Sequence, residues 1–410
     1  MGAVIHHGDC LEVMAGMEAG SVDAVVTDPP YGLSFMGKHW DHGVPGVPFW
    51  TEARRLLPPS GYLLAFGGTR SSHRLACALE DAGFEIRDTL MWLYGSGFPK
   101  GKSCLKPAWE PIILARKPGP MRELGIEECR VGMEQTVTRR NGDSGGNGAF
   151  GRDERVFERE NPPGRWPANL ILECTCAETR EGAMRTNSQE SVRNGVGVLK
   201  HGGENARPQH SDTGGETIRR GYGDNGKEPV RIHTDPNCPC AMLDGQTGNL
   251  GVSAGTQRTT SASWLGTRGK LEDKPIGMGD SGGASRFFYC PKASRSERDS
   301  GLWELPEREA MRYSEKGQGP LAQQTPSKPV RQSNHHPTVK PVDLMRWLVR
   351  LVARPGDTVL DPFCGSGTTG VACAEEGRDF IGIEREAEYV EIARRRIDAA
   401  SAQQRLEVFA

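Results

Sequence analysis

Two short aspartate–proline segments, far apart in the chain, combine residue types that are suited to chemistry. The first consists of Asp28, Pro29, Pro30 and Tyr31, and the second of Asp361, Pro362, Phe363, Cys364, Gly365, Ser366, Gly367 and Thr368. Each directly follows a short apolar run, residues 24–27 and 358–360, which predicts a buried strand. Because ligands bind at the carboxyl ends of parallel strands, we expect both turns to face one crevice.

The first turn is suited to holding an exocyclic amino group of a nucleobase. Such an amine is a poor nucleophile, because its lone pair is delocalised into the ring. The Asp28 carboxylate and the Pro29 carbonyl can accept both N–H bonds and so localise the lone pair. Two prolines stiffen the turn, Tyr31 can stack on the base, and a base in a duplex must first swing out. The alternative is a proline-rich surface turn with a packed tyrosine.

The second turn is suited to a cofactor with a cationic end. Residues 365–370 match the pattern G-x-G-x-x-G, and Glu384 ends the next predicted strand about twenty residues later. This pattern fits a dinucleotide as well as S-adenosylmethionine (AdoMet), since in both cases glycines admit the ligand and the acid accepts bonds from ribose hydroxyls. Asp361 favours AdoMet, whose methionine end is cationic, because a pyrophosphate would be repelled. The alternative is a strand-to-helix turn that binds no ligand.

The remaining pattern predicts two α/β parts on either side of a loop-rich region. We expect strands at residues 61–66, 84–94, 111–115 and 380–383, and helices at 49–57, at 71–82, from Pro341, from Thr368 and up to Ile397. Residues 192–227 lack apolar periodicity and cannot bury much surface. Residues 285–290 resemble a strand and residues 317–334 a linker. Together the two α/β parts predict one doubly wound sheet.

Composition and length fit a large folded unit with irregular stretches. The chain has 410 residues, 36% of them hydrophobic, and 53 glycines. No apolar run approaches the roughly 18 residues of a membrane span, and no signal peptide is evident, so we expect a cytoplasmic protein without a membrane partner. Its 11 cysteines then fit a reducing compartment, where most are small core residues.

The two turns, taken together, resemble those of the amino-group DNA methyltransferases, which act on adenine N6 or cytosine N4. The catalytic turn precedes the loop-rich region and the cofactor turn follows it, an order similar to the permuted β class of that family. The resemblance covers residues 4–118 and 285–400 and implies a Rossmann-like AdoMet-dependent sheet of seven strands, one of them antiparallel. It divides the chain into a catalytic part (1–118), an inserted, loop-rich target-recognition region (119–284), and a return strand, linker and AdoMet-binding part (285–405).

Several residues gain a role only through this resemblance. Asp9 matches an acid near the AdoMet adenine, and Thr338 and Lys340 match a segment that closes over the methionine end. Trp92 matches an aromatic residue that helps to hold the flipped base. Core packing is the alternative for Trp92, and a solvated charge at a helix start is the alternative for Lys340. The Asp-Pro-Pro-Tyr form favours adenine, although cytosine-N4 enzymes overlap with it.

Partners follow from the same resemblance. It implies double-stranded DNA, and it allows a second copy of the chain and a cognate restriction endonuclease. Residues 286–350 contain 12 Lys and Arg against 7 Asp and Glu, an excess of 5. Candidates for phosphate contacts in that stretch are Arg286, Lys292, Arg295 and Arg298, each with a solvated surface charge as alternative. The rival functions are an NAD-dependent oxidoreductase and a DNA-binding protein without catalysis.

Two close cysteine pairs bracket the least regular part of the chain. They are Cys174 with Cys176 and Cys238 with Cys240. Four thiolates can hold a structural zinc ion and stabilise a region with little core, and His233 can replace one of them. The spacing within each pair is shorter than is usual in zinc fingers. Reduced thiols and a redox-active pair remain as alternatives.

Overall fold

The computed structural model describes most of the two α/β parts and portions of the region between them. The described residues are 2–33, 43–94, 105, 107–131, 136–141, 156–161, 164–176, 178–185, 227–236, 238–247, 255–257, 274–276, 284–289, 291, 295–303, 305–306, 308–310, 313–315, 324–326 and 330–408. Within these ranges no helix combines the length and the apolar character that crossing a membrane requires.

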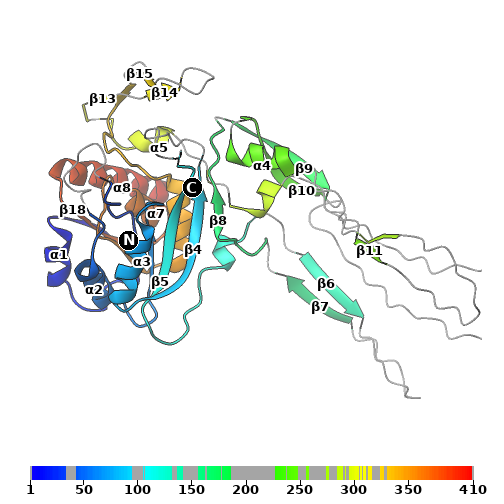
Figure 1. The fold of residues 1–410 in the computed structure, drawn as a ribbon, viewed down its shortest axis with the longest axis horizontal. Coiled ribbons are helices and arrows are strands. Elements are labelled where there is room, and N and C mark those ends of the chain that lie inside the picture. The colour runs from blue at the N-terminus through cyan, green and yellow to red at the C-terminus, as the bar shows by residue number, and fades with distance from the viewer. Residues whose placement is uncertain are drawn as a thin grey trace, which may run out of the picture.

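An eight-stranded sheet forms the centre of the molecule (Figure 1). The strand order is β1-β18-β17-β2-β3-β5-β4-β8. The strands are β1 (Ala3–His7), β2 (Ala24–Thr27), β3 (Tyr62–Phe66), β4 (Glu85–Leu93), β5 (Trp109–Arg116), β8 (Leu170–Leu172), β17 (Thr358–Asp361) and β18 (Asp379–Glu384). Only β5 runs antiparallel to its neighbours within this sheet. The predicted α/β class with one antiparallel strand is confirmed, and β8 adds an eighth strand to the expected seven.

Strands from the N-terminal and the C-terminal α/β parts pair in the middle of this sheet. Strand β17 lies between β18 and β2, with Val359 opposite Ala24 and Leu360 opposite Val25 in parallel register. The turns that follow β2 and β17 therefore both start at the carboxyl-terminal ends of two neighbouring strands. This register brings Asp28 and Asp361 to one side of the sheet, as the sequence predicts.

Helices cover both faces of the sheet (Figure 1). One layer is α1 (Cys10–Gly16), α2 (Val47–Leu56) and α3 (Ser72–Asp81), and the other is α6 (Val342–Val352), α7 (Thr368–Glu376) and α8 (Ala387–Val408). All five residues of β3 are buried. Leu63 and Ala65 belong to the core under α1–α3, whereas Tyr62, Leu64 and Phe66 belong to the core under α6–α8. Successive side chains of β3 point to opposite faces of the sheet, and both faces are covered by helices. The strand is therefore apolar at every position.

Most of the predicted helices and strands of the two α/β parts are confirmed to within a few residues, and two details differ. Pro341 is the N-cap of α6, not its first helical residue. The strand predicted at residues 285–290 is wrong, because Ala284–Phe287 form a 3-10 helix (η5); of the described residues in this stretch, Tyr289 alone forms a bridge, to Ile171. Tyr289 stacks on Trp347 with ring centroids 5.6 Å apart, so its aromatic character serves packing and not a ladder.

The region between the α/β parts contains short hairpins and helices. Its paired strands are β6 (Thr136–Asn141) with β7 (Val156–Asn161), β9 (Thr179–Arg185) with β10 (Lys227–His233), and β11 (Gly255–Gln257) with β12 (Lys274–Ile276); its helices are η3 (Glu127–Cys129) and α4 (Pro239–Thr247). In Figure 1 these pairs lie beyond β8. Of the irregular stretch 192–227, all but Lys227 lies outside the described residues.

The predicted linker at 317–334 contributes strands where it is described. After α5 (Arg295–Asp299), strand β13 (Arg308–Ala310) pairs with β16 (Val330–Gln332), and β14 (Tyr313–Glu315) pairs with β15 (Gln324–Pro326). These are two-stranded sheets outside the central one.

The third glycine of the G-x-G-x-x-G match serves packing. A Cβ atom at Gly370 would lie 2.3 Å from Cδ1 of Ile397 and 2.7 Å from Cε1 of Phe380. Helix α7 therefore packs directly on β18 and α8 at this point. The third glycine of this motif is required for the close approach of helix and sheet, and many nucleotide-binding folds share this requirement.

We predict that Gly370→Ala lowers the free energy of unfolding by about 1 kcal/mol. Alanine favours a helix over glycine by about 1 kcal/mol, but overpacking against the rigid Phe380 ring costs about 1–3 kcal/mol. Equilibrium denaturation with urea measures the difference. Gly16→Ala in α1 is the matched control, because its Cβ has nothing within 4 Å, and it should be neutral or stabilising. A Gly370→Ala protein as stable as the control would contradict the packing explanation.

Candidate active site at the carboxyl edge of the sheet

Two cavities open side by side at the carboxyl edge of the central strands. The first measures about 370 Å³ and the second about 280 Å³. Both are lined by residues of the first turn and of the segment before α6, namely Asp28, Pro30, Thr338 and Lys340. The second turn, including Asp361, lines only the first cavity. Two ligands bound in these cavities would therefore meet at Asp28.

The Asp28 carboxylate is held by a cation and a phenol. Its Oδ1 accepts a hydrogen bond of 2.7 Å from the Tyr31 hydroxyl, and its Oδ2 accepts one of 2.7 Å from Nζ of Lys340. A second carboxylate, Glu110 at the start of β5, lies 3.3 Å from the same Nζ and 3.1 Å from the Tyr31 hydroxyl. Because β5 runs antiparallel, its first residues lie at the edge where β2 and β17 end. Four polar side chains thus form one network.

This network fixes the protonation states of Lys340 and Tyr31. Burial alone would lower the pKa of Lys340, but the carboxylates of Asp28 and Glu110 outweigh burial and raise this pKa above its usual value. Burial, together with the same two carboxylates, raises the pKa of Tyr31 well above its usual value. The ammonium group also lies 4.8 Å from the ring centroid of Phe66. At neutral pH the site contains a permanent cation and a permanent phenol.

Asp361 is a buried acid that is 2% exposed. Its Oδ1 accepts bonds from the Thr27 hydroxyl at 2.6 Å and from the Phe363 backbone N–H at 3.1 Å. Its Oδ2 accepts a bond of 2.6 Å from the Thr369 hydroxyl. Burial raises the pKa of Asp361 to about 6 in spite of these donors. One lone pair of Oδ2 stays available to a ligand in the first cavity.

The glycine loop lies between Glu384 and His336. The Gly365 backbone N–H donates to Oε2 of Glu384 at 2.8 Å, and Gly365 adopts a φ of 53°. A Cβ there would lie 2.9 Å from Nε2 of His336, so both the backbone conformation and the space require glycine. Burial, with Arg298 nearby, lowers the pKa of His336 to about 3, and this imidazole is neutral.

A buried arginine from α8 supports the same loop. Nη1 of Arg396 donates to the Ser366 carbonyl at 2.7 Å, to the Ser366 hydroxyl at 3.2 Å and to the Thr368 hydroxyl at 3.1 Å. The side chain is 2% exposed, and burial lowers its pKa to about 10. A guanidinium that contacts carbonyl and hydroxyl groups of one loop holds that loop in shape.

The other residues predicted for the cofactor lie around the first cavity. Those that line it are Asp9, Thr338, Lys340, Asp361, Pro362, Phe363, Cys364, Gly365, Ser366, Thr368 and Glu384. Asp9 caps α1 through its carboxylate, which accepts from the backbone N–H of Leu11 and of Glu12. Gly367 instead caps α7 in the left-handed region and approaches Ala393.

Aromatic side chains surround the second cavity. They are Tyr31, Trp92, Tyr94 and Trp109. Trp92 meets Phe66 edge to face, with centroids 6.3 Å apart, and is 7% exposed. Its Nε1 is buried and has no hydrogen-bond partner among the described residues. Trp92 is therefore part of the core and of the cavity wall at once.

Several residues of the site escape prediction from the sequence. Glu110, Tyr94, Trp109, Thr27 and Arg396 carry no motif. Glu110 offers a weak signal, because a charged residue opens a strand that is otherwise buried. Arg396 offers none, since it stands among other arginines of a long helix and only the tertiary structure distinguishes it.

The candidates outside these cavities are placed as follows. Cys174, Cys176 and Cys238 form a cluster with His233, whereas Cys240 is not part of it. The Arg298 guanidinium donates to the backbone carbonyls of Asn334 and His336, which supports the segment before Thr338. Lys292 and the side chains of Arg286 and Arg295 lie outside what the structure describes.

Comparison with known proteins identifies the family. The model of the N6 and N4 methyltransferases, described as DNA methylase, matches residues 22–395, and the chain belongs to this family.

Individual relatives match shorter segments. DNA adenine methyltransferase YhdJ of Escherichia coli (strain K12) is 49% identical over 67 residues, which are 16% of this chain and 23% of the relative. Type II methyltransferase M2.DpnII of Streptococcus pneumoniae is 52% identical over 64 residues, 16% of this chain and 24% of the relative. The chain thus matches less than a quarter of the length of these curated relatives. The crystal structure of the M1.HpyAVI–SAM complex aligns with 97% of this chain and 99% of that one, at 17% identity and a TM-score of 0.39.

We predict that Arg396→Met speeds amide hydrogen exchange at residues 364–369. The substitution leaves the Ser366 carbonyl and two hydroxyls without their donor, a loss of about 1–3 kcal/mol for buried groups. Removing a buried charge offsets part of this cost in global stability, so the local readout is the decisive one. Mass spectrometry of exchanged peptides measures it. Arg395→Met is the matched control, because Arg395 pairs on the surface with Glu391, and loop exchange unchanged in both variants would contradict the assigned role.

Proposed function

We propose that this protein transfers a methyl group from AdoMet to the exocyclic N6 amine of a flipped adenine in duplex DNA. The observation that carries the proposal is the pair of cavities that meet at Asp28. One cavity offers a carboxylate and a glycine loop, as a cationic nucleoside requires. The other offers aromatic walls and hydrogen-bond acceptors, as an extrahelical base requires. Membership of the DNA methylase family agrees with this assignment.

The first cavity fits the proposed cofactor by its donors and acceptors. The open lone pair of Asp361 suits a cationic amino group. The carboxylate of Glu384 accepts the backbone N–H groups of Gly365 and Glu386, and its further acceptor capacity suits a ribose hydroxyl. AdoMet supplies the methyl group as an activated electrophile. The proposed cofactor residues also include Asp9 and Thr338, which line the same cavity.

The second cavity supports the proposed role of the first turn. Asp28 and the Pro29 carbonyl would accept the two N–H bonds of the amine and direct its lone pair toward the first cavity. Tyr31 and Lys340 hold the Asp28 carboxylate in place before the base arrives. The ammonium of Lys340 donates to Oδ2 of Asp28 and so orients this carboxylate as an acceptor. Trp92 and Tyr31 would contact the flat faces of the base.

Adenine is the proposed base because the first turn has the form Asp-Pro-Pro-Tyr, which is more typical of adenine enzymes. The similarity to a DNA adenine methyltransferase agrees with that choice. Cytosine N4 is the second candidate, since the same acceptor pair suits its amine and both enzyme types share the family. Residues 119–284 are the proposed target-recognition region. A second copy of the chain and a restriction endonuclease remain proposed partners.

We predict that Asp28→Ala abolishes methyl transfer, lowering its rate by at least about a hundredfold, and leaves AdoMet affinity nearly unchanged. Glu110 still balances the charge of Lys340 in this variant, and the acceptors of the first cavity stay intact. Glu384→Ala is the matched counterpart, and it should lose AdoMet affinity. Calorimetry measures affinity. Loss of AdoMet binding in Asp28→Ala would mean that the substrate side is misplaced.

Single-molecule sequencing of DNA from a methylation-free host that expresses the chain tests the reaction and the base together. N6-methyladenine at one motif, absent with Asp28→Ala, is the expected result. N4-methylcytosine would retain the mechanism and reverse the base assignment. No modified base would remove the support for DNA as substrate.

We predict that AdoMet binds about tenfold more weakly at pH 5 than at pH 7. The pKa of Asp361 is about 6, so its carboxylate is ionised at pH 7 and largely protonated at pH 5, where it loses its attraction for a cation. Affinity therefore rises as the pH increases through 6. His336, with a pKa of about 3, stays neutral across this range. Titration calorimetry at several pH values measures the effect, and Asp361→Asn should flatten it; a slope that persists there would assign it to another group.

A further inference from the structure

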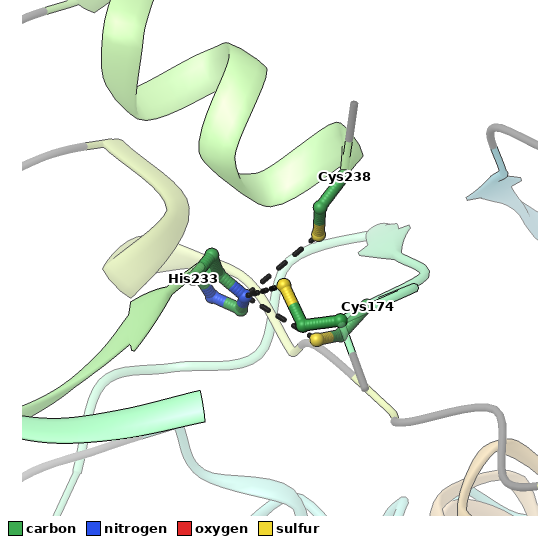
Figure 2. Close-up of side chains that lie close together, drawn as sticks. Cys174, His233 and Cys238 are labelled. Carbon is green, nitrogen blue, oxygen red and sulfur yellow. Dashed lines mark hydrogen bonds between the residues drawn. The ribbon is translucent and has the colours of Figure 1, made fainter. Parts of the chain in front are cut away.

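A compact cluster of three cysteines and one histidine lies outside both cavities. The side chains of Cys174, His233 and Cys238 point toward one another (Figure 2), and Cys176 completes the set. Their ligand atoms all lie within 4.8 Å of one another. Nδ1 of His233 is 3.3 Å from the Cys174 sulfur, 3.9 Å from that of Cys176 and 3.8 Å from that of Cys238.

These separations fit a tetrahedral zinc ion. With Zn–S bonds of about 2.3 Å and a Zn–N bond of about 2.0 Å, the edges of the tetrahedron are about 3.8 Å between sulfurs and about 3.5 Å between sulfur and nitrogen. The observed distances from Nδ1 lie within a few tenths of an ångström of that value. Closing the widest pair of the cluster requires a contraction of at most about 1 Å.

Burial and hydrogen bonding also favour a metal. All three cysteines are buried, and His233 is half-buried. The backbone N–H of Asp235 donates to the Cys176 sulfur at 3.4 Å, a contact that stabilises negative charge on a thiolate ligand. None of the three cysteines forms a disulfide in the structure. A redox pair explains neither the third sulfur nor the central imidazole.

We propose that Cys174, Cys176, His233 and Cys238 bind a structural zinc ion. Three thiolates and one imidazole form a closed donor set that leaves no position for water, which is typical of structural and not catalytic zinc. The set contains His233 in place of Cys240. Cys240 contacts the backbone carbonyls of Leu172 and Glu173 at 3.9 Å.

The ion joins three separate elements to the edge of the central sheet. Cys174 and Cys176 follow strand β8, His233 ends β10, and Cys238 directly precedes α4. The local apolar cluster consists of Leu172 and the four cysteines, with five partly buried residues around it. So small a core supplies little hydrophobic stabilisation. Metal coordination provides the folding free energy that this core lacks.

The zinc site also has a position relevant to the second cavity. Strand β8 pairs with β4, where Ile171 lies opposite Trp92 and Leu172 opposite Leu93. The Glu173 N–H donates to the Leu93 carbonyl at 2.8 Å, one residue before the first zinc ligand. The ion therefore fixes the β9–β10 hairpin and α4 beside the strand that carries Trp92. The metal assignment itself stands independently of the proposed methyl transfer.

Metal analysis of the full-length protein, purified under reducing conditions without a metal-binding tag, tests the proposal directly. We expect one zinc per chain. Replacement by Co²⁺ should give the thiolate charge-transfer and visible bands of tetrahedral cobalt. A protein that contains no zinc, and that gives no such bands when the metal-free, reduced form is titrated with Co²⁺, would overturn the proposal.

Variants define the ligand set. Cys174→Ser, Cys238→Ser and His233→Ala should each lose zinc, whereas Cys77→Ser, which replaces an exposed cysteine of α3, should keep it. Cys240→Ser should also keep one zinc and an unchanged cobalt spectrum. Loss of zinc in Cys240→Ser with retention in His233→Ala would refute the assigned ligands in favour of four cysteines. Because the two main cores contain none of the ligands, circular dichroism should show that the central domain stays folded in every variant.

Discussion

The candidate active site is built around one hydrogen bond across the centre of the sheet. The Thr27 hydroxyl donates to Oδ1 of Asp361 at 2.6 Å, and these residues stand 334 positions apart in the chain. Thr27 ends β2 and Asp361 ends β17, so the bond joins the two strands from which both turns leave. It also satisfies a buried carboxylate that would otherwise be costly to ionise. Because both turns follow adjacent parallel strands, ligands bound at the two turns would lie next to each other.

The second constraint is the charge of Lys340. An ammonium ion buried among aromatic rings is tolerated only with anions close by, and Asp28 and Glu110 supply two. The resulting cluster of one cation and two anions carries a net negative charge. In this cluster Asp28 already accepts hydrogen bonds from Tyr31 and Lys340. An incoming amine would have to replace such contacts, and Glu110 then remains to balance Lys340. Two acids around one lysine thus let one of them exchange partners without leaving a buried charge alone.

Residues whose role follows from their immediate neighbours in the sequence can be predicted, whereas residues whose role depends on contacts with other elements cannot. Asp28 and Asp361 were predictable, because an apolar run followed by an acid and a proline identifies a strand end within a few residues. Glu110 and Arg396 were not, since their contacts are with other elements of the fold: Glu110 contacts Tyr31 and Lys340, and Arg396 contacts the loop at Ser366. Residues 285–290 show the opposite failure. Their aromatic run has the composition of a strand, but Tyr289 packs on Trp347 and the backbone turns.

The central sheet and the elements beyond β8 are constrained in different ways. The central strands need continuous apolar runs, because helices cover both of their faces. The elements beyond β8 have no such requirement. They are attached through three register positions on β4 and through a few side chains around Cys174. A few buried thiols replace a hydrophobic core there, and they constrain only the residues that form the attachment. These attachment residues lie apart from the residues around Asp28, so in the proposed enzyme the part of the chain that recognises DNA would be constrained separately from the site of methyl transfer.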